Sequence, residues 1–202
     1  MSMPIRVRPK PKNNEWAVNT DPTRLDAMYT SLLGPGGAGL LSEEVKWLAV
    51  THKSFDQGRR GFNDRLSYLG RRIVELQTSL ALLAPGAESV ELGAPDAHGR
   101  RPYAHPALAP LEHLSQGAKR RVLDKTRLAQ LGDTYGVTGV MRWRPKKAEN
   151  LRGSGQEVVV TQTIYAIIGA LALEQGGGVA NRVVQEKILA PLGVGAEGGY
   201  AA

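Results

Sequence analysis

The sequence predicts an all-α fold, a bundle of helices in one domain. Apolar residues recur at steps of three and four along several segments, and no segment alternates apolar and polar residues as a half-buried strand does. The chain has 202 residues, of which 42% are hydrophobic, enough for one sizeable helical core. No run approaches the roughly 18 consecutive apolar residues of a membrane helix, so we expect no membrane span.

The first expected element is a basic, extended tail over residues 1–19. Three prolines prevent a regular helix there, and no acid precedes Glu15. The cations of the tail are Arg6, Arg8, Lys10 and Lys12. We interpret it as an arm that contacts phosphates, with a merely disordered terminus as the alternative. A mitochondrial presequence would also be basic, but it should form an amphipathic helix, which the prolines disfavour.

Two short helices follow, predicted over residues 22–33 and 43–51. Asp21 and the proline after it are typical of a helix start, and a run of glycines marks the end of the first helix. Residues 34–39 are expected to form a flexible loop. Ser42, which precedes two glutamates, is predicted to cap the second helix.

The longest amphipathic pattern predicts a helix from Asn63 to Leu83. Its apolar stripe consists of Leu66, Leu69, Ile73, Leu76, Leu80 and Leu83. Residues 85–110 contain five prolines among glycines and histidines, so we expect a long surface excursion there rather than a second core.

The remaining elements complete a domain that is expected to end at residue 192. They are helices from about residue 111 onward, a basic cluster at 142–147, a long apolar helix at 156–175, a last helix at 179–189 and a glycine-rich tail at 193–202. The domain is expected to begin at residue 20.

The chain is basic, with Lys+Arg 26 against Asp+Glu 19 and a net charge of +7. This balance favours a polyanionic partner, either nucleic acid or an anionic membrane surface. Aromatic residues make up 5% of the chain, which favours contact with phosphates over extensive base stacking. A globular protein with surplus charge is the alternative. The absence of Cys excludes disulfides, a thiolate zinc site and a cysteine nucleophile.

Two of the predicted helices carry a family resemblance. The segment LAVTHKSF begins at Leu48, NDRLSYLGR begins at Asn63 and QTIYAIIGA begins at Gln162. In this order the segments resemble the ribonuclease III domain, with its signature helix N-E-x-L-E-x-L-G-D and its later helix D-x-x-E-A-x-x-G-A. A connecting helix around Arg127 is also similar, so the resemblance covers about residues 40–192. It implies a ribonuclease III-like helical bundle.

The resemblance also implies a loss of chemistry. The family binds magnesium through four carboxylates on these two helices, and the metal activates water against the RNA backbone. The four corresponding positions hold Ser67, Arg71, Gln162 and Tyr165. A signature acid that is not a ligand survives as Asp64. We therefore expect no catalytic residue, no metal and no cofactor, and a working nuclease hidden by misalignment is the alternative.

Arg71 allows two interpretations. Its guanidinium could take the place of the metal charge and bond to Tyr165 or to a nearby acid such as Asp64. The alternative is an exposed arginine on a solvated helix face.

Basic clusters supply the candidate RNA-binding residues. They are Arg6, Arg8, Lys10, Lys12, Arg59, Arg60, Lys119, Arg120, Arg121, Arg142, Trp143, Arg144, Lys146 and Lys147. Trp143 is expected to stack on an unpaired base while its neighbours hold phosphates. Solvated loops are the alternative.

Small residues on the two signature helices indicate close helix approach. Because the family dimerises in this region, the resemblance implies a dimer interface at Leu69, Gly70, Ile73 and Gly169. The four histidines lack the spacing of a metal site.

A ribonuclease III frame without its metal ligands is similar to the inactive ribonuclease III-like proteins of the mitochondrial large ribosomal subunit, above all the short fungal type. The resemblance implies a structural component in the mitochondrial matrix that binds ribosomal RNA. It also implies contacts with other large-subunit proteins and a heterodimer with a second ribonuclease III-like protein. The lack of a double-stranded RNA-binding domain after Leu192 fits that type. The alternative is a non-catalytic subunit of an RNA-processing complex with an active ribonuclease III partner.

Overall fold

The structure is a computed structural model that describes residues 16–83, 95–100 and 105–194. Its elements are α1 (Pro22–Leu33), η1 (Gly37–Leu40), α2 (Glu43–Ala49), α3 (Asp64–Leu82), η2 (Pro106–His113), α4 (Gln116–Val122), α5 (Lys125–Thr134), α6 (Val137–Val140), α7 (Gln156–Glu174), α8 (Gly177–Val183) and η3 (Val184–Leu189). Within these ranges, the β-type pairing is limited to an isolated bridge between Thr51 and Arg142. The all-α prediction is confirmed.

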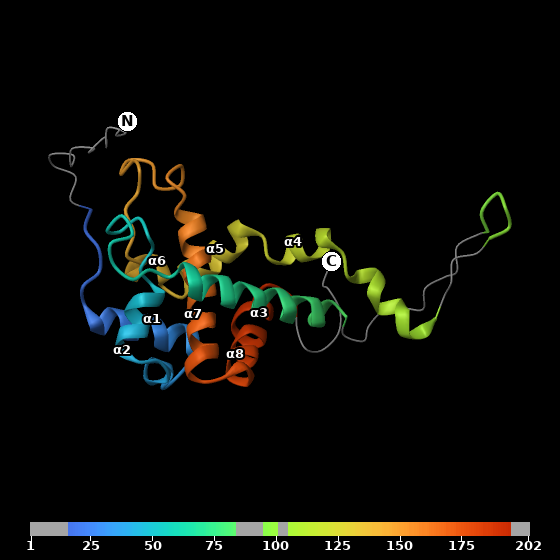
Figure 1. The fold of residues 1–202 in the computed structure, drawn as a ribbon, viewed down its shortest axis with the longest axis horizontal. Coiled ribbons are helices and arrows are strands. Elements are labelled where there is room, and N and C mark those ends of the chain that lie inside the picture. Colours follow the sequence, from blue (N-terminus) through green and yellow to red (C-terminus); the bar gives the residue numbers. More distant parts are fainter. Residues whose placement is uncertain (1–15, 84–94, 101–104, 195–202) are drawn as a thin grey trace, which may run out of the picture.

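Parts of the predicted organisation lie outside the described residues. These parts are residues 1–15, 84–94, 101–104 and 195–202, which hold most of both predicted tails and half of the excursion. The domain boundaries stay a prediction. The described end of the excursion is more regular than expected, because η2 is a 3-10 helix that projects away from the bundle (Figure 1).

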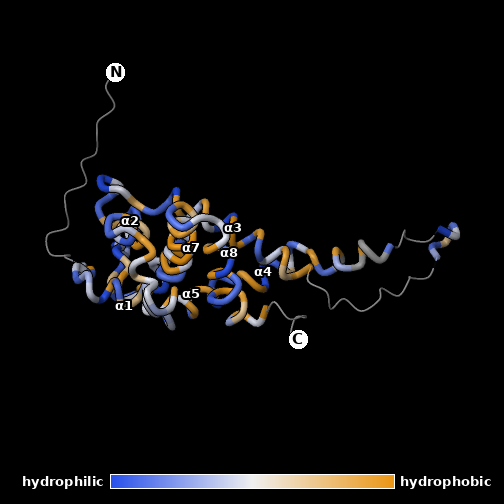
Figure 2. The backbone as a smooth tube through the Cα atoms, turned by 90° about the horizontal axis from the view of Figure 1, so that it is seen from below, coloured by the Kyte–Doolittle hydropathy of each residue, from blue (hydrophilic) through white to orange (hydrophobic). Residues whose placement is uncertain are grey.

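The core is built around α7, which runs through the middle of the bundle (Figure 2). Its residues from Val159 to Leu171 are almost all buried, so the helix is apolar on every side. By length and composition it could cross a membrane, with a mean hydropathy of 1.4, but 61% of this stretch is buried within the protein. A buried core helix has the same properties, because every face of it meets apolar neighbours.

The helices α3 and α7 cross at a pair of glycines. A β-carbon built on Gly70 would overlap the carbonyl oxygen of Tyr165 and lie 2.7 Å from the amide nitrogen of Gly169. One on Gly169 would overlap the carbonyl oxygen of Leu66. The close approach that the small residues predicted is thus confirmed. It occurs inside the chain, so the assignment of Gly70 and Gly169 to a dimer interface is wrong.

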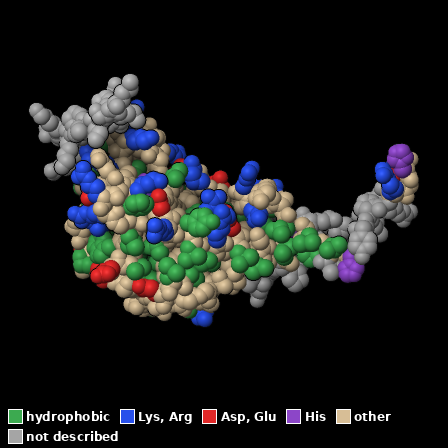
Figure 3. Space-filling view, viewed as in Figure 1, with side chains coloured by type: hydrophobic (Ala, Val, Ile, Leu, Met, Phe, Trp, Pro, Cys, Tyr) green, Lys and Arg blue, Asp and Glu red, His purple; other side chains and the backbone are tan. Residues whose placement is uncertain are grey.

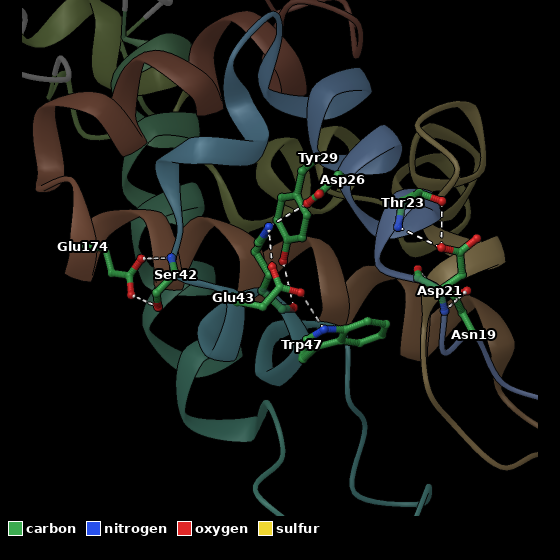
Figure 4. A network of polar contacts seen from close by, with 10 residues as sticks. Asn19, Asp21, Thr23, Asp26, Tyr29, Ser42, Glu43, Trp47 and Glu174 are labelled. Carbon is green, nitrogen blue, oxygen red and sulfur yellow. Dashed lines mark hydrogen bonds and ion pairs between the residues drawn. The ribbon is translucent and has the colours of Figure 1, made fainter.

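At the N-terminal side of the bundle, the prediction for the first helix holds, and that for its connection needs correction. The carboxylate of Asp21 accepts from the amide of Thr23 at 2.9 Å, as a helix cap does. The expected flexible loop at 34–39 ends in the 3-10 turn η1. Ser42 does not cap α2 with its side chain. Its amide and its hydroxyl both bond to the carboxylate of Glu174, at 2.7 and 2.6 Å (Figure 4).

A buried polar group ties α1 to α2. The ammonium group of Lys46 lies 2.6 Å from a carboxylate oxygen of Asp26 and 2.8 Å from one of Glu43. The hydroxyl of Tyr29, also fully buried, donates to the carbonyl oxygen of Lys46 at 3.0 Å (Figure 4). These bonds satisfy the buried polar atoms that the helix contact would otherwise leave without partners.

Only part of the apolar stripe predicted for α3 is buried. Leu66 is buried, but Leu76 and Leu80 are 57% and 51% exposed. The residues that enter the core instead include Val74 and Thr78. The cause is the crossing at Gly70, which turns a neighbouring face of α3 towards α7 and leaves part of the apolar stripe in solvent.

Candidate functional site

The helices α3 and α7 bring together the positions that the resemblance assigns to metal ligands. The Gln162 side chain donates from Nε2 to Asp64 Oδ1 at 2.6 Å and to Asn63 Oδ1 at 3.3 Å. The ammonium group of Lys53 lies 3.4 Å from Asp64 Oδ2. Both carboxylate oxygens of Asp64 are therefore bound to N–H groups of the chain itself.

The other members of this group are neutral or cationic. Ser67 and Tyr165 are buried where α3 and α7 meet. Burial raises the pKa of the Tyr165 phenol to about 12, while the nearby Arg71 acts to lower it and Glu75 to raise it. The phenol is therefore protonated at neutral pH and offers no anionic ligand.

Arg71 pairs with an acid on its own helix. Its Nε donates to Glu75 Oε1 at 2.8 Å, and the other oxygen of Glu75 lies 3.0 Å from Arg72. The interpretation in which Arg71 bonds to Tyr165 or Asp64 is wrong. The structure favours the alternative, an arginine on the exposed side of its helix, paired along that helix.

These residues do not fit a magnesium ion. A divalent cation needs several oxygen ligands and compensating negative charge. Asp64 already accepts bonds from an amide and an ammonium, and Glu75 is paired with two arginines. Across the ranges that the structure describes, no three His, Asp or Glu side chains gather as metal ligands would. No catalytic step follows from this geometry.

The buried phenol gives a test of the contact between α3 and α7. The folded pKa of Tyr165 is about 12 against an ordinary 10.0, so the unfolded chain loses this proton first as the pH rises. The stabilisation is complete below pH 10 and is lost between about pH 10 and 12, by about 2 kcal/mol at the upper end. We expect Tyr165→Phe to flatten this part of the decline in urea-unfolding experiments. An unchanged slope would contradict the burial of the phenol.

Two basic segments that are far apart in the sequence meet at one end of the molecule. The amide of Arg142 donates to the carbonyl oxygen of Val50 at 2.8 Å, and that of His52 donates back to Arg142 at 2.9 Å. The amide of Arg144 donates to Ser54 Oγ at 2.9 Å. These bonds place the loop 52–62 beside the segment 142–147. Figure 3 shows Lys and Arg side chains gathered over this end.

Two of the predicted RNA contacts in this segment are structural instead. Trp143 is only 4% exposed and packs edge-on against Trp16, with 6.3 Å between ring centroids, so the prediction that it stacks on a base is wrong. The guanidinium carbon of Arg142 lies 4.5 Å from the ring centre of Phe55 and 5.2 Å from that of Trp47. Arg142 thus faces aromatic rings of its own chain.

The third basic cluster lies elsewhere. Lys119, Arg120 and Arg121 form the last turn of α4, on the side of the bundle from which η2 projects (Figure 1). The structure therefore divides the predicted RNA-binding residues into separate surfaces. The four cations of the N-terminal tail lie outside the described residues.

An exposed stripe on α3 went unnoticed in the sequence. It consists of Tyr68, Arg72, Leu76 and Leu80, each four residues after the last, and we call it the α3 outer stripe. Tyr68 is 66% exposed and has the guanidinium carbon of Arg72 5.2 Å from its ring centre. Hydrophobic side chains show along α3 and onto η2 in Figure 3. The four-residue spacing of the stripe is visible in the sequence, but the apolar periodicity assigns two of its leucines to the core.

The chain is similar to known proteins over most of its length. A sequence profile described as Ribonuclease-III-like matches residues 42–192. Large ribosomal subunit protein mL57 from Neurospora crassa is 50% identical over 185 residues, which cover 91% of this chain and 68% of that protein. The crystal structure of the nuclease domain of ribonuclease III from Campylobacter jejuni superposes with a TM-score of 0.55. Its identity is 19%, over 84% of this chain and 95% of that domain. A second structure of the same domain gives 0.52 at 19% identity, over 73% and 86%.

The bacterial structures share the fold, and the profile and the fungal protein share the sequence. The predicted ribonuclease III-like bundle is therefore confirmed. The chain belongs to the ribonuclease-III-like family and, within it, to the family of large ribosomal subunit protein mL57.

Proposed function

We propose that the chain is a structural, non-catalytic component of the mitochondrial large ribosomal subunit. The observation that carries this proposal is 50% identity, over 91% of the chain, to a large ribosomal subunit protein. Its location is the mitochondrial ribosome in the matrix, and its partners are ribosomal RNA and other proteins of the large subunit. Such a component needs a stable frame and exposed contact surfaces, but no reaction centre.

The remodelled site supports the non-catalytic role. Asp64 is bound by Gln162 at 2.6 Å and by Lys53 at 3.4 Å. Hydrolysis of RNA by the family's route needs a metal-activated water and positive charge at the phosphorus. Here N–H groups of the chain bind the carboxylate of Asp64 instead, which favours a structural use of this contact between α3 and α7.

The α3 outer stripe supports pairing with a second ribonuclease III-like protein. Exposed Leu76 and Leu80 are costly in a protein that stays alone, and a large apolar patch on a surface usually marks an interface. Leu69 and Ile73, which the sequence assigned to the interface, are half-buried beside this stripe and remain part of the proposal. Ribosomal RNA would meet the basic surfaces instead.

A sucrose gradient tests the ribosomal role. We expect the chain to co-migrate with the large ribosomal subunit of a mitochondrial lysate at low and at high salt. Contacts made mainly through phosphates weaken steeply with salt, so a loosely held factor should move to the light fractions in high salt. That outcome would favour the alternative, a silent subunit of an RNA-processing complex. Magnesium-dependent cleavage of duplex RNA by the purified chain would contradict both readings.

A further inference from the structure

We propose that the loop 52–62 and the segment 142–147 form a single surface that binds the phosphate backbone of RNA. We call it the basic end. The inference rests on the proposed function, because it names the part of the chain that meets ribosomal RNA.

The charge of the basic end comes from both segments. The loop contributes three Lys or Arg residues and the segment contributes four, with Asp56 as the one acid within the two ranges. Arg59, Arg60, Lys146 and Lys147 are exposed. Arg60 keeps an ion pair with Asp56, at 3.3 Å, so the acid neutralises only one of them. A surface with this imbalance attracts a polyanion.

The loop is held in shape before any partner binds. The amide of Phe55 donates to His52 at 3.0 Å, that of Gly58 to Lys53 at 2.9 Å, and that of Arg59 to Asp56 at 2.9 Å. Together with the backbone bonds between His52 and Arg142, these turns fix where the loop arginines lie. A preformed surface loses less conformational entropy on binding than a flexible one.

Aromatic packing beneath the surface supports it. The guanidinium of Arg142 lies close to the rings of both Trp47 and Phe55, and burial, together with the nearby charge of Arg60, lowers its pKa. Its backbone joins the loop to the segment, so the residue holds the two parts of the basic end together. It is therefore a positioning residue rather than a contact.

Trp16 covers the aromatic residue of the segment 142–147. Its ring packs edge-on against the buried Trp143, which is 127 positions later in the chain, at 6.3 Å between ring centroids. Trp143 therefore belongs to the packing of the fold, and the exposed lysines of its segment supply the surface.

The experiment removes charge in pairs. A labelled RNA stem–loop is titrated with the full-length chain, with Arg59→Gln/Arg60→Gln, with Lys146→Gln/Lys147→Gln and with both pairs combined. We expect about tenfold weaker binding for each pair and a shallower salt dependence, by roughly 0.7 to 0.9 per lost phosphate contact. The control is Arg182→Gln/Lys187→Gln, which removes the same charge from α8 and η3. Pairs that behave like this control would overturn the proposal.

The outcomes separate this inference from the ribosomal role. The charge-pair variants could bind RNA like the control while the wild-type chain still co-migrates with the large subunit at high salt. In that case the basic end is not the RNA-binding surface, and the ribosomal role stands. If the wild-type chain leaves the subunit at high salt, the ribosomal role fails whatever the RNA titration gives. Binding to phosphatidylglycerol vesicles without binding to the stem–loop would overturn the choice of RNA as the partner.

Discussion

Replacing Gly70 with Ala is expected to lower the free energy of unfolding by about 4 kcal/mol, the largest effect of any single substitution considered for this chain. The new methyl group would overlap the Tyr165 carbonyl oxygen and lie 2.7 Å from the amide of Gly169. Both are backbone atoms in the middle of helix α7, so neither can move aside by changing a rotamer. The two helices would have to separate at the centre of the core.

Two other glycines serve as matched controls in the same urea-unfolding measurement. At Gly132 a methyl group would meet only side-chain atoms, Val160 Cγ1 and Ile164 Cδ1, which can adjust, so Gly132→Ala should cost about 1–2 kcal/mol. At Gly178, in α8, nothing lies within 4 Å, and Ala should stabilise the helix by about 0.5 kcal/mol. If Gly70→Ala were as stable as Gly178→Ala, the result would contradict the close contact of α3 and α7 at Gly70.

The same crossing explains how far periodicity could predict the fold. The stripe of α3 located the helix to within a residue or two, because spacing reports helix type reliably. It did not identify the buried face. In the sequence, Leu76 and Leu80 have the spacing of core residues. Gly70 determines which face of α3 is buried, but in the sequence it is only a residue with low helix propensity. The buried and the exposed positions of α3 can be distinguished only when the position of α7 is known.

The candidate site divides in a similar way. The expectation that the metal ligands are lost comes from single residues, such as Arg71 and Gln162, at the positions that the resemblance assigns, and it stays a prediction. The bond between Gln162 and Asp64 was not readable, since it joins residues 98 positions apart. Trp143 was misread for the same reason. A tryptophan among cations suggests base stacking until Trp16, far away in the sequence, is seen to cover it.

The double substitution Leu76→Glu/Leu80→Glu is expected to prevent the chain from entering the large ribosomal subunit. Both side chains are more than half exposed. The free energy of unfolding of the isolated variant should therefore lie within about 1 kcal/mol of the wild-type value. In a protein interface, two apolar anchors together contribute enough that their replacement by charges weakens binding about 100-fold or more. The measurement is the fraction of the chain that co-migrates with the subunit in a sucrose gradient.

The matched control is Val158→Glu/Leu173→Glu, which places the same two charges on exposed apolar positions of a different helix, α7. We expect this control to assemble normally, because scattered surface hydrophobic residues carry little binding energy. Normal assembly of the α3 variant would show that the stripe is not the contact. Equal loss in both variants would point to general sensitivity to surface charge. A defect confined to α3 would link the turned face of the helix to its partner, because the glycine crossing that buries Gly70 is what exposes Leu76 and Leu80.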